Sequence, residues 1–318
     1  MYGEELNNRD LIAVARSHFR SDGLPTKHIA VVSGALDGIE RVLREQLRPG
    51  DRVIVEDPGF SGIMDLLAAL ALVPIPVAVD DEGMLPDALL RAMRTAASAI
   101  IVVPRAQNPT GAALDDERAA DLRALLEEHP GVLVLEDDHA GPVAGAPAIS
   151  IAGGERWGVV RSMSKMLSPD LRLAAMTGDP TTIARVQGHQ ILGPGWVSHI
   201  LQRVVVELLR DPATARRIER ATAAYAKRRA ALIDALAARG VPAHGRSGLN
   251  VWVPLREERP VVEALRDRGW VVASGERFRM QTGPGIRVTV ADLRAREADQ
   301  IAEIVATVEH GGRLARAY

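Results

Sequence analysis

The sequence predicts an α/β protein with a mainly parallel sheet in a large first domain and a smaller, C-terminal α+β domain. Three observations support this prediction. Short β-rich runs alternate with helical patterns over about the first 180 residues, which is the arrangement of βαβ units. The runs, such as VIV, AIIVV and VLVL, are almost continuously apolar, as in strands that helices cover on both faces. The chain then changes to long helical patterns followed by a short mixed segment.

The elements expected in the first domain follow one another closely. Strands are expected at 28–32, 52–56, 73–79, 99–103 and 132–136. Helices are expected at 35–47, 62–72 and 115–128, because apolar residues recur there at helical spacing. The sequence Arg-Pro-Gly at 48–50 then ends the first of these helices, since proline and glycine stop a helix.

The second half of the chain predicts a different arrangement. Long helices with few breaking residues are expected at 196–210 and 213–239. A β-α-β-β-α order is expected for 249–255, 260–268, 270–273, 285–290 and 293–308. We therefore expect a large domain of residues 1–208, and a second unit of residues 209–318 that comprises the long connecting helix and the small domain.

The composition excludes several classes of function. The 318 residues suffice for about two domains, and 47% hydrophobic and 25% charged residues are typical of soluble globular proteins. The net charge of −2 supplies no overall basic field for nucleic acid. The absence of cysteine excludes disulfides, thiolate catalysis and cysteine-ligated zinc, and no metal site is expected. Without a signal sequence or a long apolar run, we expect no membrane span and a cytoplasmic location.

Lysine is rare, and one lysine lies in a suggestive segment. Only three of the 39 basic residues are lysines, at positions 27, 165 and 227. Lys165 lies in the segment 159–172, where it follows a further expected strand and stands between apolar residues. Desolvation there would lower the pKa of Lys165 and allow its amine to form a Schiff base. Ser162, Ser164 and Arg172 are close by and suit a phosphate group. A solvated loop, with a lysine retained by chance, is the alternative.

Other polar groups follow expected strands, at the sheet edge where ligands bind in doubly wound folds. Ser-Gly-Ala at 33–35 opens a helix, where free N–H groups can hold a phosphate, although such residues also serve as ordinary caps. Asn-Pro-Thr-Gly at 108–111 follows another strand, and a simple turn is its alternative. Asp-Asp-His at 137–139 supplies carboxylates for a helix cap, a metal or a cation such as a protonated ring nitrogen.

Taken together, these groups describe one cofactor. A lysine for a Schiff base, a phosphate cup, a carboxylate for a pyridine nitrogen and an asparagine for a ring hydroxyl match pyridoxal 5'-phosphate. On the motifs at 108–111, 136–139, 162–165 with 172, and 285–289, the chain resembles the fold-type I pyridoxal-phosphate proteins, class I/II aminotransferases. It is most similar to the effector domains of MocR-type regulators of the GntR family, including the PtsJ-like branch, through PRAQNPTG, EDDH, RSMSKMLSPDLRLA and WVSHILQ.

The resemblance implies an aspartate aminotransferase-like fold and a role for each matching residue. Lys165 would form the Schiff base, Asp137 would face the ring nitrogen, and Asn108 would bind the ring hydroxyl. Phe60 would stack on the ring, and His139 stands where most members have a tyrosine that donates to the ring oxygen. The residues implied for the phosphate are Ser33, Gly34, Ala35, Ser162, Ser164 and Arg172.

Arg287 matches the arginine that clamps the α-carboxylate of the substrate in this family. Strand alternation also separates Arg287 and Thr289 from the apolar residues of 285–290. A buried arginine needs an anionic partner, which is either the substrate or an acidic side chain such as Glu276.

Two functions follow from the resemblance, and a degenerate fragment that folds poorly is a third possibility. The first is transamination of an amino acid with a 2-oxo acid, and the second is an amino-acid or cofactor sensor derived from a regulator. We expect a homodimer with the cofactor near the subunit interface. Family members have several tens of residues before the point that matches Met1, and the regulators also have a helix-turn-helix there, so we expect no DNA binding by this chain alone.

Overall fold

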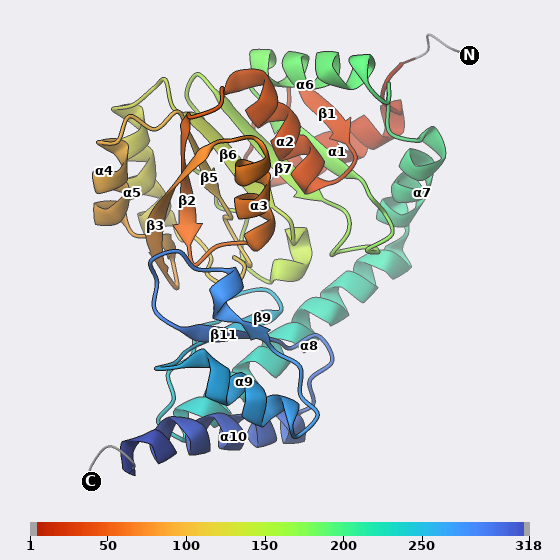
Figure 1. Ribbon diagram of the computed structural model, residues 1–318. Coiled ribbons are helices and arrows are strands. Elements are labelled where there is room, and N and C mark those ends of the chain that lie inside the picture. Colours follow the sequence, from red (N-terminus) through yellow and green to blue (C-terminus); the bar gives the residue numbers. More distant parts are fainter. Residues whose placement is uncertain (1–4, 315–318) are drawn as a thin grey trace.

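The computed structural model describes residues 5–314 and contains one large and one small sheet (Figure 1). The large sheet has eight strands in the order β1-β8-β7-β6-β5-β2-β3-β4. Its strands are β1 Ile29–Val32, β2 Arg52–Asp57, β3 Val73–Asp80, β4 Gly83–Met84, β5 Ala99–Val102, β6 Leu133–Asp138, β7 Trp157–Ser162 and β8 Ala174–Gly178. The five central strands from β7 to β3 pair in parallel, whereas β8 and β4 run antiparallel to their neighbours. The predicted mainly parallel sheet is therefore confirmed.

Helices cover both faces of this sheet, as the apolar strands predict. The helices of the large domain are α1 Arg9–Ser21, α2 Ala35–Gln46, α3 Ser61–Ala69, α4 Pro86–Met93, α5 Asp116–Glu127, α6 Pro180–Leu192 and α7 His199–Arg210. Apolar residues of α2, α3 and α6 form one buried cluster with the sheet. Those of α1, α4, α5 and α7 form a second cluster on the opposite face. Successive strand residues join alternate clusters, as Val53 and Ile54 do.

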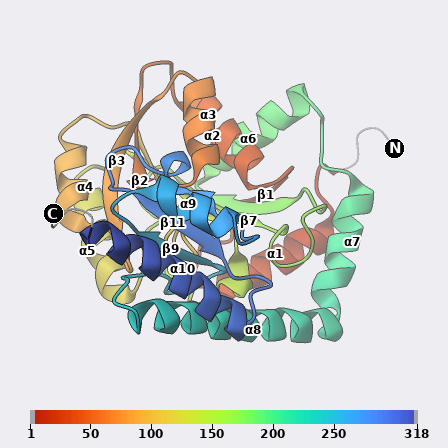
Figure 2. The same cartoon turned by 60° about the horizontal axis from the view of Figure 1, so that its bottom comes forward.

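A long helix leads from the large sheet to the small one. This helix, α8 Pro212–Ala237, descends from α7 and passes behind the small domain in Figure 1, and it lies along the lower edge of the molecule in Figure 2. The small domain contains β9 Asn250–Pro254, α9 Glu258–Arg266, β10 Ala273–Ser274, β11 Gly285–Thr289 and α10 Ala295–Leu314. Its three strands are antiparallel in the order β10-β11-β9, and α10 packs on α8 and α9. The expected β-α-β-β-α order is confirmed, whereas the domain boundary at 208 stays a prediction.

Three local predictions differ from the structure. The helix expected from Trp196 begins at His199. Strand β6 continues to Asp138, so the two aspartates lie within the strand rather than after it. Helices α1, α4 and α6 and strands β4 and β8 were not expected. Within residues 5–314, no helix combines the length and the apolar character that crossing a bilayer requires.

Candidate functional site

A cavity of about 360 Å³ lies where the carboxyl ends of the parallel strands face the small domain. Figure 1 shows the arrow of β2 pointing toward that domain. Ten of the predicted site residues line the cavity: Ala35, Phe60, Asn108, Asp137, His139, Ser162, Ser164, Lys165, Arg172 and Arg287. The other lining residues are Leu36, Pro169, Leu249, Asn250 and Thr289. The fold thus brings together residues that are 250 positions apart in the chain, as the strand-end argument predicts.

Asp137 presents a buried carboxylate to this cavity. Its residue is only 2% exposed, and Oδ1 has no hydrogen-bond partner among the described residues. Burial raises the pKa of Asp137 to about 6, the charge of Asp138 adds to this rise, and His139 opposes it. A buried acceptor without a partner is costly, so Oδ1 is suited to a cationic or N–H group that enters the cavity.

Asp138 points away from the cavity and is fully paired. Arg105 donates to both of its oxygens at 2.9 Å, and Nε of Arg161 donates to Oδ2 at 2.6 Å. These guanidinium groups hold the pKa of Asp138 well below its usual range. Arg161 also pairs with Asp22 at the end of α1, at 2.6 Å. Alternation along β6 puts the two carboxylates on opposite sides of the strand, and Asp137, the one that the resemblance implied, lines the cavity.

One end of the cavity has the features of an anion site. Nη1 of Arg172 donates to Oγ of Ser164 at 3.3 Å, and the N–H of Ser164 donates to Oγ of Ser162 at 3.2 Å. Gly34 has a φ of +114°, and a Cβ there would lie 3.1 Å from Nη2 of Arg172, so only glycine suits this position. In the described chain no side chain caps α2, which leaves its first N–H groups for an anion.

Two residues of the predicted phosphate cup are absent from the cavity lining. Gly34 is buried behind it, whereas Ser33 is exposed and its N–H donates to Oδ2 of Asp37 at 2.8 Å. The N–H of Ser33 therefore already has an anionic acceptor. Ala35, at the first turn of α2, is the member of this segment that lines the cavity.

Lys165 reaches the cavity from a turn after β7. The expectation that it would be desolvated is wrong, because Lys165 is exposed while its neighbours Met163 and Met166 are buried. Those two methionines anchor the turn in the buried cluster that the sheet forms with α1, α4, α5 and α7. The side chain of Lys165 consequently extends from a fixed backbone into open space beside Ser164 and Asp137.

Arg287 approaches the cavity from strand β11 of the small domain. Nη1 donates to Oδ1 of Asn108 at 2.9 Å, and the guanidinium lies 4.9 Å from the centre of the Phe278 ring. Its Nε is buried without a partner in the part of the chain described, and burial together with the charge of Arg277 lowers its pKa. The alternative prediction, that Glu276 is the acidic partner of Arg287, is wrong, because no ion pair joins the two side chains among residues 5–314.

Phe60 and His139 complete the walls. Phe60 precedes α3, and a Cβ on Gly62 would lie 2.7 Å from its ring, so the ring is held closely against the helix backbone. Nε2 of His139 lies 3.0 Å from the carbonyl oxygen of Ala106, which makes Nε2 a donor. This contact fixes the tautomer if the ring is neutral, with Nδ1 left as an acceptor.

Sequence reasoning named Arg287 as a site residue but not the other residues of the small-domain wall, and it missed a buried acid. Thr289 donates to Oδ1 of Asn250 at 3.0 Å, and the alternation that selected Arg287 also places Thr289 on its face. Glu56, on the strand that precedes Phe60, accepts from Gln107 at 3.1 Å and is fully buried. Burial, with the charge of Asp137, raises the pKa of Glu56 to about 8. No periodicity in the sequence marks this acid.

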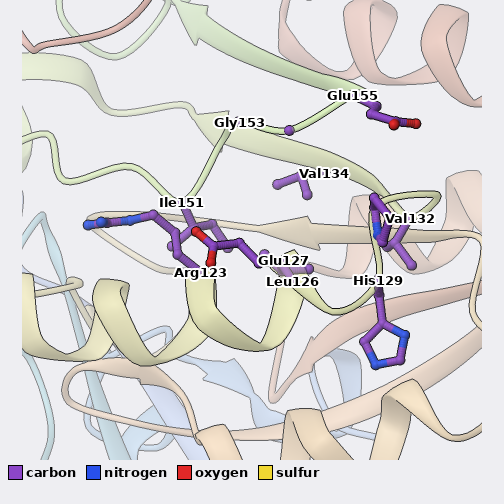
Figure 3. Close-up of a pocket in the computed structure, with 11 residues that line it drawn as sticks. Arg123, Leu126, Glu127, His129, Val132, Val134, Ile151, Gly153 and Glu155 are labelled. Carbon is purple, nitrogen blue, oxygen red and sulfur yellow. The ribbon is translucent and has the colours of Figure 1, made fainter.

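A second hollow of about 240 Å³ lies at the other end of β6, beside the start of the strand (Figure 3). Apolar side chains, among them Leu126, Val134 and Ile151, form much of its lining, with Arg123 and Glu127 beside them. None of the predicted site residues lies there. Within residues 5–314, no three histidine, aspartate or glutamate side chains gather around a possible metal position.

Comparison with known proteins identifies the family of this chain. The family described as "Aminotransferase class I and II" matches residues 11–305. The chain belongs to this family. It is 37% identical over 306 residues to the vitamin B6 salvage pathway transcriptional repressor PtsJ of Salmonella typhimurium, covering 95% of this chain and 71% of that protein. It is 25% identical over 268 residues to the mitochondrial kynurenine/alpha-aminoadipate aminotransferase of Bos taurus, covering 76% of this chain and 62% of the enzyme.

Solved structures show the same fold. Kynurenine aminotransferase of Pyrococcus horikoshii, described in complex with PMP, superimposes with a TM-score of 0.88 at 22% identity, over 98% of this chain and 82% of that one. The alpha-aminoadipate aminotransferase LysN of Thermus thermophilus, complexed with N-(5'-phosphopyridoxyl)-L-leucine, gives 0.84 at 21% identity, over 98% and 83%. The aspartate aminotransferase-like fold is therefore confirmed, and the resemblance predicted from the motifs holds for the family.

Proposed function

We propose that the chain binds pyridoxal 5'-phosphate in the 360 Å³ cavity and transfers an amino group between an amino acid and a 2-oxo acid. The observation that carries this proposal is the buried Oδ1 of Asp137, which has no partner in the described chain and faces the same cavity as Lys165. A protonated ring nitrogen would satisfy this oxygen, and the negative charge would keep the nitrogen protonated. The residues present therefore fit the cofactor.

The remaining contacts would hold the other parts of the cofactor. Arg172, Ser162, Ser164 and the free N–H groups of Ala35 and its neighbour at the start of α2 suit the phosphate. Phe60 would stack on the ring. Asn108 would bind the ring hydroxyl, and His139 would stand near the ring oxygen in place of the usual tyrosine.

When bound, the cofactor supplies an aldehyde that condenses with amines and a ring that accepts the electron pair of the α-carbon. Lys165 would hold the cofactor through its amine and then move the α-proton, as base and acid in turn. Arg287 would bind the α-carboxylate through two parallel N–H···O bonds. Asn108 accepts from Arg287 and so holds the guanidinium at the wall of the cavity. The burial of Asp137 would strengthen its effect on the ring nitrogen, because solvent screens the charge little there.

Trapping the bound cofactor tests this proposal. Borohydride reduction of protein loaded with pyridoxal phosphate, followed by peptide mapping, should label Lys165. Lys165→Arg should lose the absorbance band of the bound cofactor and keep the fold, because the charge remains and the nucleophile is gone. Lys27 and Lys227 are also exposed, so Lys227→Arg is a matched control that should keep the band. A label on Lys27 or Lys227 would overturn the assignment.

A second function, an effector domain that senses the cofactor or an amino acid, is favoured by the 37% identity to a repressor. It would use the same contacts without turnover. Loaded protein incubated with an amino acid and a 2-oxo acid separates the two functions. Repeated formation of the new amino acid supports the aminotransferase. A single spectral change without multiple turnovers supports the sensor.

We also propose that the chain forms a cytoplasmic homodimer. Five exposed apolar side chains follow one another in sequence from the end of α6 into α7: Ile191, Leu192, Trp196, Ile200 and Val204. Exposed apolar patches of this kind mark association surfaces. A second copy of the chain is the partner that membership of an aminotransferase family favours.

A further inference from the structure

A single buried carboxylate ties the large domain to a loop of the small domain. Asp57, the last residue of β2, is 2% exposed. Its Oδ1 accepts from the N–H of Met280, and its Oδ2 accepts from those of Gln281 and Thr282, all at 2.8 Å. Oγ1 of Thr282 donates back to the carbonyl oxygen of Asp57, also at 2.8 Å. Three charge-assisted bonds to consecutive N–H groups make this a strong and directional connection.

The loop held by Asp57 supports the arginine of the cavity. It directly follows Phe278, whose carbonyl oxygen accepts from the N–H of Gly59 at 2.7 Å. The ring of Phe278 lies under the guanidinium of Arg287 at 4.9 Å. The rings of Trp252 and Phe278 pack edge to face, with ring centres 6.5 Å apart. Displacement of the 278–282 loop would therefore move the surface on which Arg287 lies.

Asp57 also belongs to the segment that carries the ring-stacking residue. Phe60 is three positions further along and lines the cavity, while Arg287 lines it from the small domain. Asp57 thus connects both walls: its backbone leads to Phe60, and its side chain holds the loop beneath Arg287. The bond from Arg287 to Asn108 is a second side-chain contact between the two walls.

We propose that Asp57 is a positioning residue that sets the distance between Arg287 and the cofactor-stacking face of Phe60, and so determines affinity for the amino-acid carboxylate. This rests on the proposed function, since it assumes that the cavity binds the cofactor and an amino acid. A neutral amide in place of the carboxylate would turn one acceptor into a donor that faces N–H groups. The loop would then lose its fixed position while Phe60 and the cofactor contacts of the large domain stay in place.

Asp57→Asn tests the proposal, and the chain offers a matched control. Asp179 is a buried carboxylate that also accepts three backbone N–H groups, from Trp157, Thr181 and Thr182, each at 2.9 Å. Asp179 follows the antiparallel strand β8. It therefore lies at the edge of the sheet where the parallel strands begin, opposite the edge that forms the cavity. Asp179→Asn should lower stability to a similar degree without disturbing the cavity.

The measurements are cofactor affinity, amino-acid affinity from the spectral change of loaded protein, and amide hydrogen exchange. Asp57→Asn should keep cofactor affinity within about threefold and weaken amino-acid binding by roughly tenfold or more. Exchange at Met280, Gln281 and Thr282 should become faster. Asp179→Asn should leave all three readouts unchanged. A milder variant, Thr282→Val, removes one hydroxyl bond and should weaken amino-acid binding by about threefold.

Three outcomes would overturn the proposal. The first is equal amino-acid affinity in Asp57→Asn and Asp179→Asn. The second is a parallel loss of cofactor and amino-acid affinity in Asp57→Asn, which would mean general disruption of the cavity. The third is an amino-acid affinity of Thr282→Val equal to that of the unmodified protein. This outcome decides the question if Asp57→Asn does not fold. If the proposed function is wrong, the unmodified protein binds no cofactor, which is a separate result. The hydrogen-exchange comparison then still tests whether Asp57 holds the 280–282 loop.

Discussion

Replacing Asp137 by asparagine should stabilise the cofactor-free protein at neutral and alkaline pH. Burial raises the pKa of this carboxyl from 3.8 to about 6. Below pH 3.8 the group is protonated in both the folded and the unfolded chain and has no effect. As the pH rises toward 6, the unfolded chain loses its proton first, so the free energy of unfolding falls. At pH 8 the buried charge costs about 3 kcal/mol, and at pH 5 roughly half as much.

Asp137→Asn removes this cost and keeps the shape of the side chain. Urea denaturation of the cofactor-free protein, followed by tryptophan fluorescence at pH 5, 6, 7 and 8, measures the difference. The variant should gain stability over the unmodified protein as the pH rises, up to about 3 kcal/mol. Asp170 is exposed, and Asp170→Asn is the control that should show no such trend. A variant less stable than the unmodified protein at pH 8 would refute the reasoning, because it would mean that Oδ1 has a partner.

Four further predictions concern other contacts. Arg287→Lys should keep cofactor absorbance and weaken the amino-acid response by roughly tenfold or more, because a forked donor is lost; lower thermal stability with an unaltered response would mean a structural role. Asp138→Asn should destabilise the fold by about 3–5 kcal/mol in urea, since the buried guanidinium of Arg105 loses its charged partner and that of Arg161 keeps only Asp22. Leu192→Asp should shift sedimentation at micromolar concentration from dimer to monomer; a monomeric unmodified protein contradicts the proposal. The hydrogen bond to Asp81 raises the pKa of His244, so His244→Asn should lower the free energy of unfolding at pH 5.5 and leave it unchanged at pH 8.5. An equal loss at both pH values would contradict this.

The strands and the site residues near their ends could be predicted from sequence. Apolar runs bounded by breaking residues fix the strands, and parallel strands bring their carboxyl ends to one edge, so Asn108 and Asp137 had to meet. Alternation also puts Asp137 and Asp138 on opposite sides of the chain, whereas the choice of Asp137 came from the family resemblance. These properties depend on local periodicity and on a general rule of sheet geometry.

The partners of individual side chains could not be predicted. The bond from Arg287 to Asn108 joins residues 179 positions apart, and which group receives a guanidinium is decided by the packing of two domains. The exposure of Lys165 likewise depends on a turn whose two methionines anchor it in the core. Sequence alone gave no sign that Asp57 would hold three N–H groups of a loop more than 220 positions away.

The antiparallel strand β8 has a consequence for synthesis on the ribosome. Strand β1 pairs only with β8 in the large sheet, with Ile29 opposite Thr177. Ribosomes add about 5–20 residues per second, so the roughly 150 residues between these partners delay their pairing by about 7–30 s. During that time the apolar β1 has no strand beside it, and α2 cannot approach Arg172, which lies two residues before β8. The anion site is therefore among the last parts of the large domain to form, and the nascent chain depends on other contacts to protect β1 until then.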